Sequence, residues 1–240
     1  QSVNFYLKHK LDSTQNLTFR LNGGWSDTKL DNAIHSNTFQ IASQVLNESQ
    51  SNYYVKGNSY QFRPSLSWMK RLGKSGRSLV SRLSGRVQNN DRNGNLKSQN
   101  NYYAVSTITD SINQRQNLRD DALNYEASMS YTEPLGGKKH LEFNAAHSNF
   151  NHKTNNNYFD ILPNNQEQKN DILSKIYQSD YSVNSAGLNL SINKKKYYLT
   201  AGFKMQYSSL VGNLQSIPEG SISKNYSRIL PALFGEYQFG

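Results

Sequence analysis

The chain has 240 residues, no cysteine and a formal net charge of +10 at pH 7. Disulfide bonds and thiolate metal sites are therefore excluded, and no apolar run of about 18 residues is present that could form a transmembrane helix. Only 35% of the residues are hydrophobic, and the mean hydropathy is −0.80. This composition suits an antiparallel β protein that keeps one face of each strand wet. The positive charge favours an anionic partner without identifying it.

Apolar and polar residues alternate in about nine segments, which predicts strands with one apolar and one polar side. In residues 197–207, YYLTAGFKMQY, every second residue from Tyr197 to Tyr207 is apolar or aromatic. The N-terminal QSVNFYLKHKL already alternates and shows no signal peptide, which indicates a cytosolic protein or an internal piece of a longer one. The alternating segments lie at residues 3–8, 17–25, 60–68, 79–87, 123–131, 141–145, 186–192, 197–207 and 228–239.

Short and long connections alternate between these segments. The short ones are polar hairpin turns, namely STQN (13–16), GKSGR (73–77), GGKKH (136–140) and NKKK (193–196). The long ones cover residues 28–57, 91–120, 153–179 and 211–226 approximately. In an up-and-down sheet, all short turns then lie at one end and all long loops at the other. Strands of about ten residues in this arrangement are typical of bacterial outer-membrane barrels, whose short turns are periplasmic and whose long loops are extracellular.

We therefore predict an all-β fold in which residues 1–240 form an antiparallel, up-and-down transmembrane β-barrel segment of about nine strands. Bacterial single-chain barrels have even strand numbers, so an odd count indicates a partial barrel domain that belongs to a larger barrel. Unpaired first and last strands would not be tolerated in lipid, which supports the same interpretation. We expect no plug domain among these residues.

Aromatic residues lie near the ends of the predicted strands. Such positions are typical of the aromatic girdles at the two membrane–water interfaces of a barrel. The girdle candidates are Trp25, Trp68, Tyr131, Tyr197, Tyr207, Tyr237 and Phe239.

Charged and amide side chains fall on the polar side of the strands, which faces the lumen of a barrel. The candidates for a ligand path are Arg20, Arg63, Arg82, Arg86, Glu126, Glu142, Lys204 and Gln206. A positive inner wall would favour an anionic ligand. The alternative, which we favour, is that these cations pair with carboxylates such as Glu126 and Glu142, or with acidic groups of a plug and strands outside these residues.

Sequences similar to known chemical motifs are incomplete. GKS (73–75) follows Trp68 where a phosphate-binding loop has a glycine. NNDRNGN (89–95) begins like a calcium loop, but Asn100 stands where the loop ends in glutamate. His147 and His152 are five residues apart and point to opposite faces of a strand, so they cannot share a metal ion. We predict no catalytic residue, metal site, cofactor or enzyme activity.

The C-terminal third combines a strand, a lysine-bearing turn and a second strand in AGLNLSINKKKYYLTAGFKMQYSSLVG (186–212), and then continues with YSRILPALFGEYQFG (226–240). Its distinctive features are Lys194–Lys196, Tyr197–Gly202, Pro231 and the aromatic ending Tyr237–Phe239. Together with SYTEPLGGKKHLEF (130–143), this succession resembles the outer-membrane β-barrel family within the TonB-dependent receptors. The resemblance implies a 22-stranded barrel around a plug domain, with import energised from the inner membrane.

We thus expect the barrel portion of a TonB-dependent receptor that binds and imports a siderophore, saccharide or peptide across the bacterial outer membrane. The expected partners are outer-membrane lipid, lipopolysaccharide, the TonB complex through a plug outside these residues, and an imported ligand of unknown identity; nucleic acid is not expected. The alternatives are a passive porin or adhesin-like barrel, a soluble β-sheet binding module, and a barrel enzyme.

Overall fold

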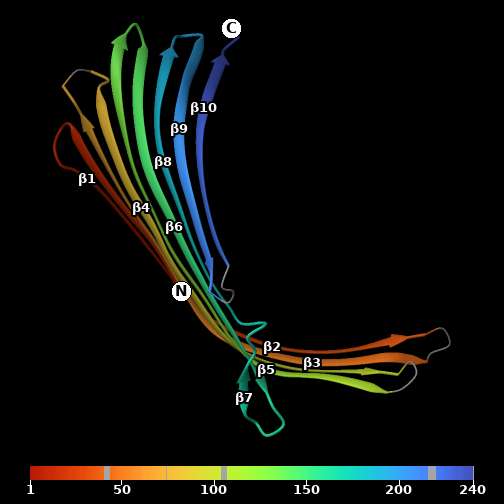
Figure 1. The fold of residues 1–240 in the computed structure, drawn as a ribbon. Helices are drawn as coiled ribbons and strands as arrows, with labels where there is room; N and C mark the ends of the chain where they lie inside the picture. The colour runs from red at the N-terminus through yellow and green to blue at the C-terminus, as the bar shows by residue number, and fades with distance from the viewer. Residues whose placement is uncertain (41–43, 74, 104–106, 216–219, 240) are drawn as a thin grey trace.

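The computed structural model describes residues 1–40, 44–73, 75–103, 107–215 and 220–239. These residues form one ten-stranded antiparallel sheet in the order β1-β2-β3-β4-β5-β6-β8-β9-β10, and β7 pairs with β6 (Figure 1). The described residues contain no helix that is long and apolar enough to cross a membrane. The predicted all-β, antiparallel, up-and-down topology is confirmed. The strands are β1 Ser2–Lys10, β2 Gln15–Phe39, β3 Val45–Arg71, β4 Ser78–Tyr102, β5 Ile108–Gly136, β6 Lys139–Ile161, β7 Glu167–Lys169, β8 Lys175–Asn193, β9 Tyr197–Leu214 and β10 Ser221–Tyr237.

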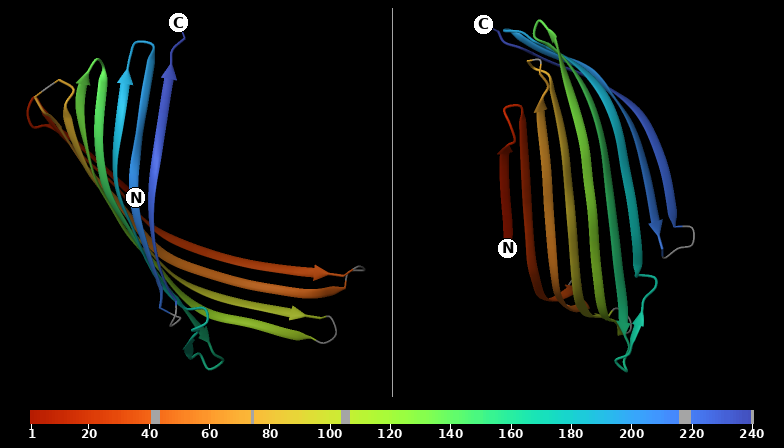
Figure 2. Two further views of the ribbon diagram at one scale, coloured as in Figure 1. Left: turned by 45° about the horizontal axis from the view of Figure 1, so that its top comes forward. Right: turned by 90° about the vertical axis from the view of Figure 1, so that its left-hand side faces the viewer.

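The sheet is a single curved layer, and it is open in the described residues. β1 pairs with β2 and β10 pairs with β9, but β1 and β10 do not pair with each other. Figure 2 shows that the far ends of β2 and β3 (orange), and of β4 and β5 (yellow-green), sweep away from the direction of the other strands. Membership in a larger barrel therefore stays a prediction.

The four predicted short turns gather at one end of the sheet, at the top of Figure 1. The turn between β5 and β6 shows why its sequence is rich in glycine. Gly136 and Gly137 have φ of 83° and 56°, in the left-handed region that residues with a side chain adopt only at a cost. Lys138 also has a positive φ of 63°. The GKS sequence lies in another of these turns, and its Lys74 is outside the described residues.

The segments predicted as long loops at the opposite end are mostly paired strand, and the connection between β6 and β8 carries the short strand β7. Most of residues 28–57 are paired strand, with Lys29 opposite Lys56 and Asn37 opposite Glu48. Residues 91–120 likewise belong mainly to β4 and β5, so the calcium-like sequence 89–95 is regular strand within β4. Backbone hydrogen bonds between neighbouring strands do not require apolar side chains. A search for apolar alternation missed these segments because their alternating residues are mainly polar.

The register assigns each side chain to one of two faces, because residues directly opposite each other project to the same side of a sheet. One row joins Leu79, Tyr131, Phe143, Leu188, Phe203 and Pro231 across six strands. The next row includes Ser130, Asn144, Gly187 and Lys204. We call the face that carries Phe203 the outer face and the face that carries Lys204 the inner face. Among the described residues, the register shifts at Thr38/Phe39 and Pro134/Gly136, close to strand ends.

The apolar side chains of the outer face are not covered by protein. Among the described residues, Val55 is the one buried hydrophobic side chain, whereas Leu83, Met205 and Leu233 are 52%, 55% and 76% exposed. No second sheet or helical layer packs on this face in the described residues. A soluble domain would bury such a surface, since each Å² of apolar area left in water costs about 25 cal/mol. The arrangement contradicts the soluble binding module and suits a lipid environment.

The two faces exchange character beyond the segments that the sequence predicted as strands. On the inner face of the far hairpins lie Leu30, Val55, Leu118, Phe150, Tyr181 and Leu210, and on the outer face lie Asn58, Asn93, Asn117, Asn155 and Asn157. The rings of Phe150 and Tyr181 stack at 6.0 Å. Hairpins that project past the lipid have water on their outside, so their apolar side chains turn inward. This exchange marks where the apolar band of the outer face ends.

The register predicts a two-residue period of lipid contact along β9. Residues 1–240 contain no cysteine, so a spin label on a single introduced cysteine reports one position once any cysteine elsewhere in the full-length protein has been replaced. We expect labels on the full-length membrane-inserted protein at Leu199, Ala201, Phe203 and Met205 to be accessible to oxygen, which partitions into lipid. Labels at Thr200, Lys204 and Gln206 should meet a water-soluble nickel chelate instead. A period other than two, or the opposite phase, would contradict the assignment of faces.

Candidate functional site

The predicted aromatic girdle residues within strands all lie on the outer face. Trp68, Tyr131, Tyr197 and Tyr237 lie towards the short turns, and Trp25 and Tyr207 lie at the other end of the apolar band. Phe239 follows β10, 90% exposed, with its ring 4.9 Å from that of Tyr237. On β2 the band covers residues 17–25. At about 3.3 Å per residue and a tilt of about 45°, such a length spans roughly 20 Å of lipid, close to the apolar band of known barrels.

Two of these aromatic side chains have polar partners near the short-turn end of the apolar band. The Trp68 Nε1–H donates to Gln15 Oε1 at 3.2 Å, and the Tyr131 hydroxyl donates to Glu133 Oε2 at 2.6 Å. An aromatic ring with a bonded polar tip is suited to an interface that is apolar on one side and wet on the other. The geometry agrees with an interfacial girdle, and this role remains a prediction.

All eight predicted lumen residues lie on the inner face. Glu126 and Arg20 belong to one row of directly opposite residues. Each of the other six residues lies an even number of positions along its own strand from the member of that row, and it therefore projects to the same face. The ion pairs among the described residues include none of the five cations Arg20, Arg63, Arg82, Arg86 and Lys204. The expected pairing with Glu126 and Glu142 is therefore not formed in this part of the chain.

Other contacts fix some of these side chains. The Arg20 guanidinium lies 5.2 Å from the centre of the Tyr6 ring, and Arg86 donates to Gln61 Oε1 at 3.2 Å. Glu142 accepts a hydrogen bond from Asn189 Nδ2 at 3.4 Å. Asn189 lies over Gly202, where a Cβ atom would come within 2.1 Å of Asn189 Oδ1. A Cβ atom there would also come within 2.6 Å of the Leu188 carbonyl oxygen, a backbone atom that cannot move away easily, so this position requires glycine.

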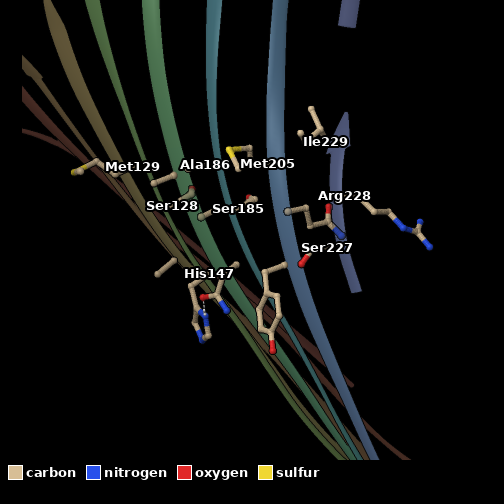
Figure 3. Close-up of a pocket in the computed structure, with 15 residues that line it drawn as sticks. Ser128, Met129, His147, Ser185, Ala186, Met205, Ser227, Arg228 and Ile229 are labelled. Carbon is tan, nitrogen blue, oxygen red and sulfur yellow. Dashed lines mark hydrogen bonds between the residues drawn. The ribbon is translucent and has the colours of Figure 1, made fainter. Parts of the chain in front are cut away.

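Two hollows in the sheet involve inner-face residues and share Ser128. The first, of about 370 Å³, is lined by Arg20, Arg82, Glu126 and several serines of β3 to β5. The second, of about 980 Å³, takes three consecutive residues from each of β5, β6, β8, β9 and β10 (Figure 3). The middle residues of these five triplets, Ser128, Ala146, Ser185, Gln206 and Arg228, form one row on the inner face. Three of them are small, which leaves room above the backbone.

Arg228 is a candidate that the sequence reasoning missed. It lies on the inner face of β10 beside Gln206, with its guanidinium 5.9 Å from the centre of the Tyr226 ring. Figure 3 shows Arg228 and Met129 extending to opposite sides of the sheet. The signal was available, because Arg228 has the polar parity of the last strand. The small residues Ser128, Ala146 and Ser185 gave no comparable signal, since their contribution is the space that they leave.

The positions of His147 and His152 follow from the alternation of side chains along β6. His147 is on the outer face and His152 on the inner face, so these two cannot meet at one metal ion. His147 Nδ1 is 2.8 Å from Asn184 Oδ1, and its Nε2 is 3.4 Å from the Tyr125 hydroxyl. In the calcium-like sequence, Asn89 donates to Asp121 and Asn93 donates to Asp91, as in an ordinary strand. The described residues contain no group of three or more possible metal ligands.

A clasp at the far end of the sheet holds β7 against β6. Arg115 Nε and Nη2 donate to the two carboxylate oxygens of Glu167 at 2.7 and 2.5 Å. The guanidinium also lies 4.2 Å from the centre of the Phe159 ring. These hydrogen bonds raise the pKa of Arg115 and hold the pKa of Glu167 below its ordinary value. The clasp fixes the connection between β6 and β8 at the far end of the sheet, on the outer face.

An uncovered apolar band on one face, a polar opposite face and short turns at one end define a wall of an outer-membrane β-barrel. The model of the outer membrane protein beta-barrel family matches residues 70–240. The chain belongs to this family, and its location is the bacterial outer membrane. A comparison with curated proteins found no match.

Solved receptor structures give weaker matches over almost the whole chain. The ferric citrate transporter FecA in its unliganded form is 11% identical with a TM-score of 0.40, and the match covers 100% of this chain and 42% of that one. BauA, the ferric preacinetobactin receptor from Acinetobacter baumannii, is 11% identical with a TM-score of 0.34, covering 97% of this chain and 44% of that one. The siderophore receptor PiuA from the same organism is 8% identical with a TM-score of 0.35, covering 99% and 45%. The chain thus spans less than half the length of these receptors.

Lipid contact of the outer face predicts an asymmetric cost of charge on β9. Phe203→Arg in the middle of the apolar band should destabilise the full-length protein by about 2–4 kcal/mol, the cost of an arginine facing lipid near the bilayer midplane. Gln206→Arg on the inner face of the same strand is the matched control and should cost much less. Denaturant unfolding in lipid vesicles measures both values. Equal costs would contradict a lipid-facing outer face.

The clasp on β7 predicts an acid-sensitive contact. Because the pKa of Glu167 is lowered in the folded protein, its contribution is complete above the ordinary carboxyl pKa and is lost as the pH falls through the lowered value. Hydrogen exchange of residues 159–169, corrected for its intrinsic pH dependence, should become faster below about pH 4.

Two variants check the clasp. Glu167→Gln should show the faster exchange already at neutral pH and lose the acid dependence. Lys169→Gln, which removes only an exposed contact with Asp171 at 4.0 Å, should behave like the original protein. An unchanged exchange rate in Glu167→Gln would show that β7 does not depend on the clasp.

Proposed function

We propose that residues 1–240 form part of the barrel wall of a TonB-dependent outer-membrane receptor, and that the whole protein imports a siderophore, saccharide or peptide. The observation that carries this proposal is the inner face, where cations without carboxylate partners in the described residues adjoin a hollow at Gln206 and Arg228. The resemblance of residues 186–240 to the barrels of TonB-dependent receptors also supports it.

In this proposal the inner face guides the ligand and performs no covalent chemistry. Arginine side chains present fixed, permanently charged donors that suit carboxylate, phosphate or hydroxamate oxygens. Glu126, Asn189 and the serines of the inner face supply hydrogen-bond partners for neutral polar groups. A wall of this composition allows a polar ligand to exchange partners along its path rather than bind at one point. The TonB complex would act through a plug that lies outside residues 1–240.

The proposal is tested by energised uptake in cells that carry the full-length protein. Radiolabelled ferric citrate, maltohexaose and a hexapeptide represent the three ligand classes. We expect uptake of one probe that stops when a protonophore dissipates the inner-membrane potential or when TonB is deleted. Uptake that continues under both conditions would identify a passive porin instead, and absence of uptake for all three probes would contradict the import function.

Alanines on opposite faces provide matched variants for the same assay. Ala146 belongs to the inner-face row of the larger hollow, whereas Ala201 lies on the outer face of β9 and does not line this hollow. Ala146→Trp should reduce uptake by about tenfold, which corresponds to 1.4 kcal/mol of lost binding. Ala201→Trp places the same indole against lipid and should leave uptake near its original level. Equal effects of the two substitutions would show that the hollow is not on the ligand path.

A further inference from the structure

The positive charge of the chain is concentrated at the short-turn end of the sheet. On β1 and β3, Lys8, Lys10, Lys70 and Arg71 lie beside the first two short turns. The other two short turns carry Lys138, Lys139 and Lys194–Lys196. We call these nine residues the basic rim. The described acidic residues at this end are Asp12, Glu133, Glu142 and Glu236, so the rim has an excess of positive charge.

Two of these acidic residues are already engaged. Asp12 accepts hydrogen bonds from the Thr14 N–H, the Thr14 hydroxyl and Gln15 Nε2 at 2.6 to 2.7 Å, and these bonds lower its pKa to about 2. Glu133 binds Arg77 through two hydrogen bonds of 2.7 Å. The ion pairs among the described residues include no member of the basic rim. The rim charges are therefore not neutralised by this part of the chain.

Backbone hydrogen bonds hold two of the lysine-bearing turns together. Asn193 N donates to Lys138 O at 2.9 Å, Lys194 N donates to Tyr197 O at 2.8 Å, and Gln238 N donates to Lys196 O at 2.8 Å. The turns and the end of β10 enclose a hollow of about 330 Å³ that is lined by Lys138, Lys194–Lys196, Tyr197 and Glu236, among others. The lysines are thus brought together by the backbone next to two girdle residues, Tyr197 and Tyr237, which face each other across β9 and β10.

We propose that the basic rim binds the phosphate groups of anionic glycerophospholipids in the membrane leaflet that the short turns face. The girdle residues mark the edge of the hydrocarbon, and Lys194–Lys196 precede Tyr197 by one to three residues, which places them at the depth of the headgroups. Lysine can lay its methylene chain along the apolar edge and direct its ammonium group to a phosphate. The far hairpins do not offer an equivalent surface, because their cations are mixed with Asp27, Asp91, Asp121 and Asp180.

This assignment depends on the outer-membrane location and not on the import proposed above. In barrels of this type the short turns face the periplasm, so the leaflet concerned is the inner leaflet of the outer membrane. The lipid would hold the barrel at a fixed depth and orientation through charge as well as through apolar contact. A protein that proves to be a passive porin would retain this function of the rim.

Native mass spectrometry of the full-length protein in detergent tests the proposal. The probes are dioleoyl phosphatidylglycerol, which is anionic, and dioleoyl phosphatidylcholine, which has the same chains without net charge. We expect the anionic lipid to bind at least about tenfold more tightly, and the difference to shrink as salt screens the charges. Equal binding of the two lipids would overturn the proposal. Binding of inorganic phosphate by a protein that shows no preference between the two lipids would overturn it as well.

Matched triple variants locate the site. Lys194→Gln, Lys195→Gln and Lys196→Gln together should abolish most of the preference for the anionic lipid. Lys29→Gln, Lys97→Gln and Lys224→Gln remove the same charge from the far half of the sheet and should preserve it. An equal loss in both triple variants would show an effect of net charge and overturn the assignment to the rim. Girdle tryptophan fluorescence, compared among the three proteins, confirms that each is folded.

Discussion

Continuous backbone pairing is the constraint on which the rest of the molecule depends. β5 pairs with β4 from Ile108 to Thr132 and with β6 from Gln114 to Gly136, so its position is fixed on both sides over almost its whole length. A shift of one residue in any strand would move every apolar side chain to the other face. The register does not shift within the apolar band, although Arg63 and Pro64 of β3 form no ladder pair with β4. The face of a residue there therefore follows from its position in the strand. Lipid on one side and a polar lumen on the other are both satisfied by this single register.

The part of the fold that contacts lipid could be predicted from the sequence because hydrocarbon imposes a strict pattern. Leu17, Phe19 and Leu21 alternate with Thr18 and Arg20, and the structure places these two sets on opposite faces. The far hairpins could not be recognised in the same way. Their outer face meets water, and residues such as Asn93, Asn95 and Lys97 give no apolar signal. The alternation continues there with its sides exchanged and its contrast reduced, and polar segments of this kind look like loops.

The candidate site, like the fold, could be predicted only in part from the sequence. The parity of Arg82, Glu126 and Lys204 was enough to place them on the inner face, because parity is a local property of a strand. Their pairing depends on which strands are neighbours and on how far each side chain reaches, and a single sequence does not give these quantities. The absence of ion pairs between Arg82 and Glu126 is therefore a property of the assembled sheet. The hollow over Ser128 and Ala146 depends on alignment across strands that are separated by many residues.

The pleat also limits how the length of this chain can change during evolution. Inserting one residue in the middle of β9 would turn Leu199 and Ala201 towards the lumen, or Lys204 and Gln206 towards the acyl chains, unless a bulge absorbed it. Turns and hairpin tips have no such restriction, because a residue inserted there lies outside the paired strands and does not shift their register. Insertions and deletions between related chains should therefore accumulate at the two rims, and those that fall within the lipid-spanning part should come in multiples of two.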